Sequence, residues 1–109
     1  MLGVRLYLAQ RISAIIMAPL VLVHLAVMVY AVQGGLDAAE ILGRTRGSVL
    51  WGLFYGLFVI AVSVHAAIGL RVIVYEYLKP SRGLLDAFTV AVGVFLFALG
   101  ARAVYAVVF

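Results

Sequence analysis

The sequence predicts an all-α integral membrane protein with three transmembrane helices. Of its 109 residues, 68% are hydrophobic and only 11% are charged, a balance that soluble globular domains do not have. The charged residues cluster between three apolar runs, at about residues 12–32, 49–74 and 84–108. Each run reaches the ~20 residues that a helix needs to cross a ~30 Å hydrocarbon core. None alternates polar and apolar residues as a membrane β-strand would, so helices are the expected spanning elements.

The first run contains Pro19, which a membrane helix tolerates as a kink. The linker after it, residues 33–48, has room for a short amphipathic stretch around residues 37–42. The second linker, residues 76–83, carries Pro80 and is expected to be a tight turn. The whole chain, residues 1–109, is predicted to form one domain.

The second run, residues 49–74, is rich in small residues. Such residues let another helix or a flat cofactor approach the helix backbone closely. The run contains Gly52, Gly56, Ala66, Ala67 and Gly69.

The charges set the expected orientation in the membrane. The net charge is +4, but the eight basic residues are few and flank apolar runs, so they indicate topology and not a nucleic-acid partner. The first ten residues lack the short apolar core and cleavage site of a signal peptide, so we expect the first span to be retained. The N-terminal side and the second linker hold five basic residues, and the opposite side holds three. This excess places the N-terminus and the second linker on the inner side of a cell inner (cytoplasmic) membrane, and the C-terminus on the outer side. The five are Arg5, Arg11, Arg71, Lys79 and Arg82, and the three are Arg44, Arg46 and Arg102.

Two histidines, His24 and His65, lie inside apolar runs. An ionisable residue in the membrane is costly and is a functional candidate by default. A neutral histidine bonded to a neighbouring helix is one interpretation, and axial ligation of a haem iron is the other. On a helix, His65 shares its face with Ala61 and Gly69, which leaves clearance for a porphyrin. His24 has bulkier neighbours at the same spacing.

The depths of the two histidines separate their roles. His24 lies about eight residues before the outer end of its span and His65 about 17 residues after the outer start of its own, which places them roughly 13 Å apart in depth. They therefore cannot be the two ligands of one haem, although each can serve one of two stacked haems. Met17 and Met28 are possible ligands, but neither lies on a different helix at the right level. The simplest completion is a partner membrane subunit with matching histidines.

Polar residues follow His65 toward the inner edge. Tyr77 follows His65 by twelve residues, which places it ~18 Å closer to the inner face, at the boundary between membrane and water. It is either an anchor in the aromatic belt or a phenol that donates to a quinone carbonyl. Arg11, at the inner start of the first span, is either a topology charge or a partner for a haem propionate. Arg71 is a second candidate for the propionates or the edge of the site.

These residues also resemble a known family. His65, Ala66 and Gly69, followed by Glu-Tyr-Leu-Lys-Pro at residues 76–80, are similar to the second-helix signature of the membrane-anchor (cytochrome b) subunits of succinate dehydrogenase and fumarate reductase, respiratory complex II. Of the family's two kinds of anchor, the chain most resembles the small D-type anchor, although Gly-Leu-Arg at residues 69–71 is also typical of the C-type anchor. Glu76 stands where the family has aspartate. Arg11 and Ser13 resemble the family's entry to helix one.

The resemblance implies a set of roles. His65 would be the axial ligand of the proximal haem b, Tyr77 would hydrogen-bond the quinone, and His24 would ligate a distal haem, as in two-haem members. Those members use low-potential quinones such as menaquinone. The three spans would form half of a heterodimeric haem-binding bundle with a second anchor subunit, and would dock an iron–sulfur subunit and a flavoprotein subunit. The chain itself would carry no catalytic residue beyond quinone binding.

Two other interpretations stay open from the sequence. One is a haem-bearing subunit of another quinone-linked oxidoreductase. The other is a haem-free structural membrane subunit, in which both histidines make hydrogen bonds between helices. The clearance at His65 argues against the second. The interior of the spans also holds no acidic residue, which a proton or cation path would usually need.

Overall fold

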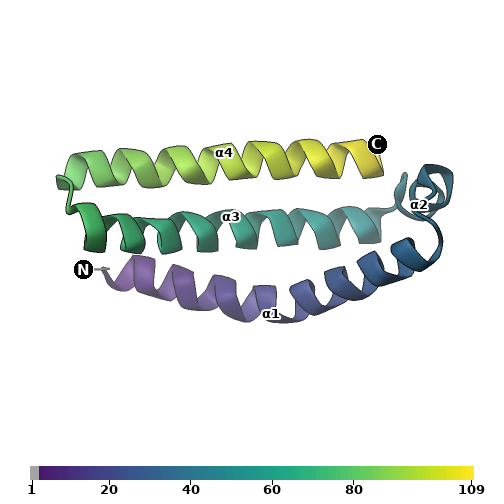
Figure 1. Ribbon diagram of the computed structural model, residues 1–109, viewed down its shortest axis with the longest axis horizontal. Helices are drawn as coiled ribbons and strands as arrows, with labels where there is room; N and C mark the ends of the chain where they lie inside the picture. The colour runs from purple at the N-terminus through teal and green to yellow at the C-terminus, as the bar shows by residue number, and fades with distance from the viewer. Residues whose placement is uncertain (1–2) are drawn as a thin grey trace.

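The computed structural model describes residues 3–109 and, in that part of the chain, consists of helices and short connections. Three long helices lie side by side in alternating directions, and a short one sits at one end (Figure 1). Each long helix is long and apolar enough to cross a membrane, which confirms the predicted all-α membrane class. The helices are α1 (Val4–Gln33), α2 (Ala38–Thr45), α3 (Val49–Leu78) and α4 (Arg82–Val108).

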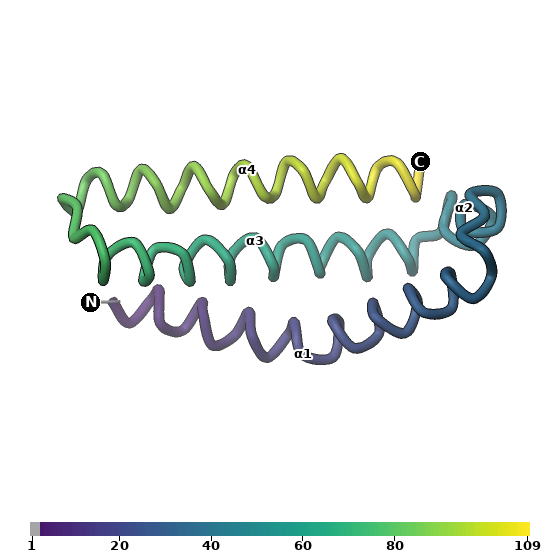
Figure 2. Tube along the Cα trace, viewed as in Figure 1, coloured from purple at the N-terminus to yellow at the C-terminus, as the bar shows by residue number. Residues whose placement is uncertain are grey.

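The long helices extend beyond the predicted spans. α1 begins at Val4, well before residue 12, and α3 continues to Leu78, past residue 74. An apolar run marks only the hydrocarbon layer, whereas backbone hydrogen bonding continues into the headgroup layer, where long cationic side chains reach water. The trace of α1 bends near its middle, where Pro19 lies (Figure 2).

The helix ends follow local rules. Asp37, Ser48 and Ser81 are N-caps, and their side chains accept hydrogen bonds from the backbone N–H groups of Ala39, Trp51 and Leu84. α3 ends where Lys79 takes the left-handed conformation, with φ 46°, directly before a proline that cannot continue the helix. The predicted tight turn between the second and third spans is built this way.

α3 lies in the centre and contacts both α1 and α4. Several of its small residues are used for this packing. A Cβ on Gly52 would lie 3.4 Å from Val108 Cγ1, and Ala67 faces Gly93 of α4. The closest approach is at Gly100 of α4, where a Cβ would lie only 2.5 Å from Val59 Cγ1.

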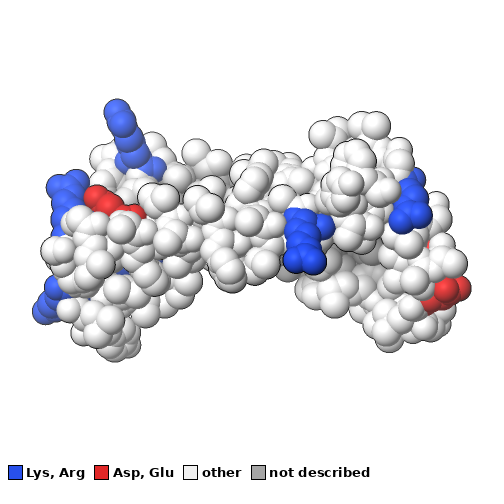
Figure 3. All heavy atoms as spheres, turned by 90° about the horizontal axis from the view of Figure 1, so that it is seen from above, with Lys and Arg blue, Asp and Glu red and all other residues white. Residues whose placement is uncertain are grey.

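The outside of the bundle is largely apolar. On the face drawn in Figure 3, Lys and Arg gather mostly toward the two ends of the long axis, with a further basic side chain nearer the middle and an otherwise uncharged surface between the ends. Only a few apolar side chains are buried within the chain itself: Ala31, Ala61, Ala67, Ile68, Leu85 and Val108. Too little apolar surface is buried within the chain to hold these helices together in water, so lipid or partner chains must cover the exposed apolar side chains.

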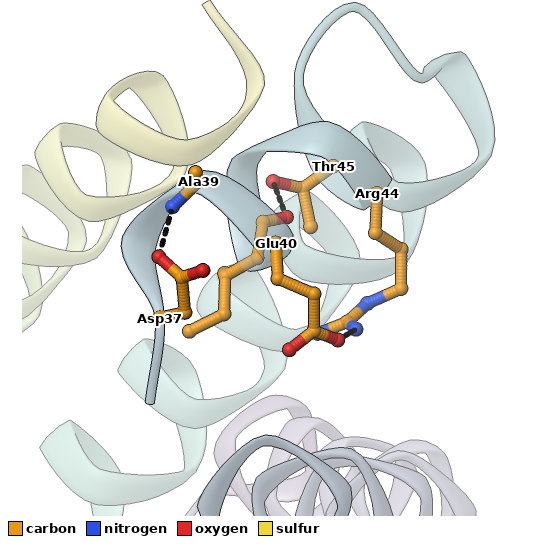
Figure 4. Close-up of polar contacts among 6 residues, drawn as sticks. Asp37, Ala39, Glu40, Arg44 and Thr45 are labelled. Atoms are coloured by element: carbon orange, nitrogen blue, oxygen red, sulfur yellow. Dashed lines mark hydrogen bonds and ion pairs between the residues drawn. The ribbon is translucent and has the colours of Figure 1, made fainter. Parts of the chain in front are cut away.

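The helix α2 lies at the end of the bundle opposite the start of α1, which we call the α2 end, and hydrogen bonds connect it to the end of α4. The fully buried Thr45 donates a hydrogen bond to Val107 O at 2.7 Å, and Gly47 N donates to Val108 O at 2.6 Å. Figure 4 shows Glu40 beside Arg44, 3.5 Å apart. The guanidinium of Arg44 also lies 5.3 Å from the ring centre of Tyr30. The short amphipathic stretch expected in the first linker is present.

The other end holds the N-terminus and the α3–α4 turn, and we call it the N-terminal end (Figure 1). The five basic residues assigned to one side of the membrane lie toward this end, and the other three lie in the half nearer the α2 end.

Candidate functional site

His65 lies on the side of α3 that faces α1. Its Nδ1 atom is 3.4 Å from the hydroxyl oxygen of Ser13. Ser13 is 5% exposed, and its hydroxyl donates to the carbonyl of Gln10 at 2.9 Å. With its single hydrogen directed to Gln10, the hydroxyl offers His65 only lone pairs, an arrangement that favours the tautomer with the proton on Nδ1. The Nε2 atom then keeps a free lone pair, as a metal-ligating imidazole requires.

The clearance around His65 has another explanation than the one the sequence suggested. A Cβ on Gly69 would lie 3.7 Å from Gln10 Nε2 of α1, and Ala61 is buried. The small residues on this stripe therefore let α1 pack closely against α3. The space that we expected for a porphyrin is used by a helix of the same chain. The case for ligation by His65 consequently depends on its free Nε2 atom and not on the cleared face.

His24 lies on α1 and lines an apolar cavity of about 430 Å³ near the α2 end. Its ring meets the rings of Phe58 and Tyr55 edge-on, at centroid distances of 5.0 and 6.1 Å. The Nδ1 atom is buried and has no hydrogen-bond partner among the described residues. Leaving a buried polar atom unpaired costs roughly 1–3 kcal/mol, so this nitrogen needs an explanation. Nothing in the described chain fixes the tautomer of His24, in contrast to His65.

The cavity beside His24 lies between α3 and α4. Its walls come from apolar faces of both helices, and Ile41 and Thr45 of α2 close one end. Three polar side chains reach this cavity from the long helices, those of His24, Tyr55 and Ser63. The cavity is therefore suited to a largely apolar group that carries a small number of polar atoms.

The two histidines lie at different levels of the bundle. Ser13 marks the level of His65 on α1, and Phe58 marks the level of His24 on α3. At 1.5 Å per residue, Ser13 and His24 are ~16 Å apart along α1, and Phe58 and His65 are ~10 Å apart along α3. The separation predicted from the sequence falls between these values. One haem cannot be bound by both residues.

The predicted polar groups at the N-terminal end lie apart from one another. Arg71 is 8% exposed and forms an ion pair with Asp86 Oδ1 at 2.7 Å, and it also donates to Thr89 Oγ1 at 3.1 Å. Arg71 therefore joins α3 to α4. Tyr77, in contrast, is 80% exposed, and Arg11 is exposed on α1. These two side chains face outward, where lipid or another subunit would meet them.

Sequence reasoning missed the partners of two of these residues. It included Ser13 in a motif but gave it no role, and it did not single out Asp86 or Thr89. A buried serine opposite a histidine leaves no signal in one sequence, because the contact depends on which helix faces meet. The Arg71–Asp86 pair was detectable in principle, since the two charges flank the same tight turn.

The family model described as succinate dehydrogenase/fumarate reductase transmembrane subunit matches residues 1–100. The chain belongs to this family. No curated protein and no solved structure matches the chain. The family match covers α1, α2, α3 and most of α4, so it includes both histidines and the N-terminal end.

Membership establishes what kind of subunit the chain is. This is a multi-pass membrane-anchor subunit of succinate dehydrogenase or fumarate reductase, and it works with the other subunits of that enzyme in a membrane complex. The resemblance seen in the second-helix motif is confirmed at the level of the family. A subunit of an unrelated quinone-linked oxidoreductase is set aside.

Proposed function

We propose that this chain is a haem b-binding anchor of succinate:quinone oxidoreductase, most like the small D-type anchor of the two-haem kind. It would dock the iron–sulfur and flavoprotein subunits, form part of the quinone site and support electron transfer between the iron–sulfur clusters and quinone. The observation that carries this proposal is the contact between Ser13 and His65, because it favours the tautomer in which Nε2 of His65 has a free lone pair for a metal.

His65 would be the axial ligand of the proximal haem, and His24 that of the distal haem. Their different levels support two sites, and a second membrane-anchor subunit would supply the opposite ligands. When bound, haem b supplies one-electron transfer between the iron–sulfur clusters and the quinone. Ser13 would hold the His65 ring in the correct tautomer. For His24, the support is the adjoining apolar cavity, which its side chain lines.

Tyr77 would donate its phenolic proton in a hydrogen bond to a quinone carbonyl. Its exposure on the last turn of α3 supports this role, since a quinone enters from the bilayer edge. We favour menaquinone over ubiquinone because two-haem members of the family use low-potential quinones. Arg11 is the better candidate for a haem propionate. Arg71 would act at the edge of the site, because Asp86 already neutralises its charge.

We further propose that the N-terminal end lies on the inner side of a cell inner membrane, with the C-terminus outside. The support is the excess of basic residues toward that end. The other subunits would dock on the same side, near Tyr77 and the proximal histidine.

A haem-free anchor is the competing function, and one observation favours it. The ring of His24 makes edge contacts with two aromatic residues, as a structural histidine would. The test is the haem b content per flavin of purified complexes that carry His65→Ala or His24→Ala. We expect each variant to lose one haem and to keep its flavin and iron–sulfur subunits. Unchanged haem content in His24→Ala would return that residue to a structural role, and unchanged content in both would refute haem ligation by this chain.

A further inference from the structure

A second cavity, of about 520 Å³, lies at the N-terminal end of the bundle. It is formed where α1 and α4 begin and α3 ends. Its apolar wall includes Val4, Leu6 and Leu85, and the charged part of its lining consists of arginines, with no acidic residue among the described lining residues. The cavity thus combines apolar surface with positive charge at the level where a membrane helix leaves the hydrocarbon layer.

Two of the three arginines that line this cavity have no acidic partner within the described residues. Arg71 is neutralised by Asp86 at 2.7 Å. Arg5 and Arg82 form no ion pair within residues 3–109. The uncompensated charge of the cavity therefore comes from these two residues, which approach it from different helices.

The positions of Arg5 and Arg82 are unfavourable for a cation without a counter-ion. Both lie in the first turn of a helix, α1 and α4 respectively, and neither first turn contains an acidic residue. The helix dipole places partial positive charge at an N-terminus and therefore favours anions there. An anion held between Arg5 and Arg82 would offset both guanidinium groups and both helix ends.

We propose that this cavity binds the phosphate of an anionic phospholipid, whose acyl chains lie along Val4, Leu6 and Leu85. A guanidinium matches phosphate oxygens with two parallel hydrogen bonds. Basic pockets between transmembrane helices at the cytoplasmic side are typical binding sites for anionic headgroups. The apolar wall favours a lipid over a free phosphate ion. This proposal rests on the orientation in the membrane given under the proposed function and not on the haem or quinone ligands.

The test compares two double variants of the purified complex with the same change in net charge. Arg5→Gln/Arg82→Gln removes the cavity charges, and Arg46→Gln/Arg102→Gln removes two exposed arginines from the half of the chain nearer the α2 end. Each delipidated complex is placed in phosphatidylcholine nanodiscs and titrated with phosphatidylglycerol, and bound lipid is counted by native mass spectrometry. We expect an affinity loss of about fivefold per arginine, and only in the first variant.

A competition with inorganic phosphate and a second double variant complete the test. Adding inorganic phosphate should not displace phosphatidylglycerol, and equal displacement would mean that the site takes a soluble anion, which overturns the proposal. Equal affinity in both double variants would overturn it as well. If Arg5→Gln/Arg82→Gln does not assemble, judged by its flavin content, Arg5→Lys/Arg82→Lys replaces it. That variant keeps the charge but loses the paired hydrogen bonds, so its affinity should fall below wild type, and an unchanged affinity would refute the site.

Discussion

Replacing Ser13 by alanine removes the acceptor that faces His65 Nδ1. The wild-type contact is 3.4 Å long, near the upper limit for a hydrogen bond, so its net contribution belongs at the low end of the usual range, about 0.5–1 kcal/mol. The larger effect is on the ring. Without this acceptor the proton is no longer held on Nδ1, and the population with a free Nε2 lone pair falls. Since about 1.4 kcal/mol corresponds to a factor of ten, losing about 0.5–1 kcal/mol should lower this population, and with it the affinity for haem, by about two- to fivefold.

The assay is haem b per flavin in the purified Ser13→Ala complex, together with the midpoint potential of the haem that remains. We expect reduced occupancy or a shifted potential for the haem assigned to His65, with flavin content unchanged. Ser13→Thr should restore both, because a threonine hydroxyl in a helix can also bond the carbonyl three or four residues before it. Ser63→Ala is a control for the haem assigned to His65 alone, since this buried serine of α3 makes no hydrogen bond to either histidine but lines the cavity beside His24. Wild-type occupancy and potential in Ser13→Ala, or equal effects of alanine and threonine, would refute the positioning role.

Two further predictions concern the quinone site and the packing of the helices. Tyr77→Phe should impair quinone reduction while succinate oxidation by an artificial acceptor stays intact, and equal loss of both activities would indicate an assembly defect instead. Gly100→Ala should destabilise the protein by about 1–3 kcal/mol, because its Cβ would meet Val59 at 2.5 Å, and this is measured as a lower thermal midpoint. Gly56→Ala is the control, since a Cβ there meets nothing within 4 Å, and a similar loss of stability in both variants would contradict the packing argument.

The features that the sequence predicted well depend on composition along one helix. Three spans follow from the lengths of the apolar runs, and the tight turn at Pro80 follows from local backbone rules. The depth difference between His24 and His65 was also predictable, because the rise of a helix per residue is fixed. All of these need only the order of residues and the thickness of a bilayer.

The features that it missed depend on which helix faces meet. The stripe that contains Gly69 is equally compatible with space for a cofactor or for a helix, and the structure places α1 there. The contact between Ser13 and His65 joins residues far apart in sequence, and no periodicity predicts it. Arg71 was interpreted as part of a cofactor site because Asp86, across the turn, was not considered as its partner.

Haem b per flavin in the detergent-purified wild-type complex, measured by pyridine haemochrome, tests the proposed function most directly. Two haems per flavin are predicted, one at the level of His65 and one at the level of His24. A ratio of one would assign the haem to His65 and leave His24 as a structural residue. Flavin and iron–sulfur subunits that purify with this chain but without any haem would contradict the proposal that it binds haem.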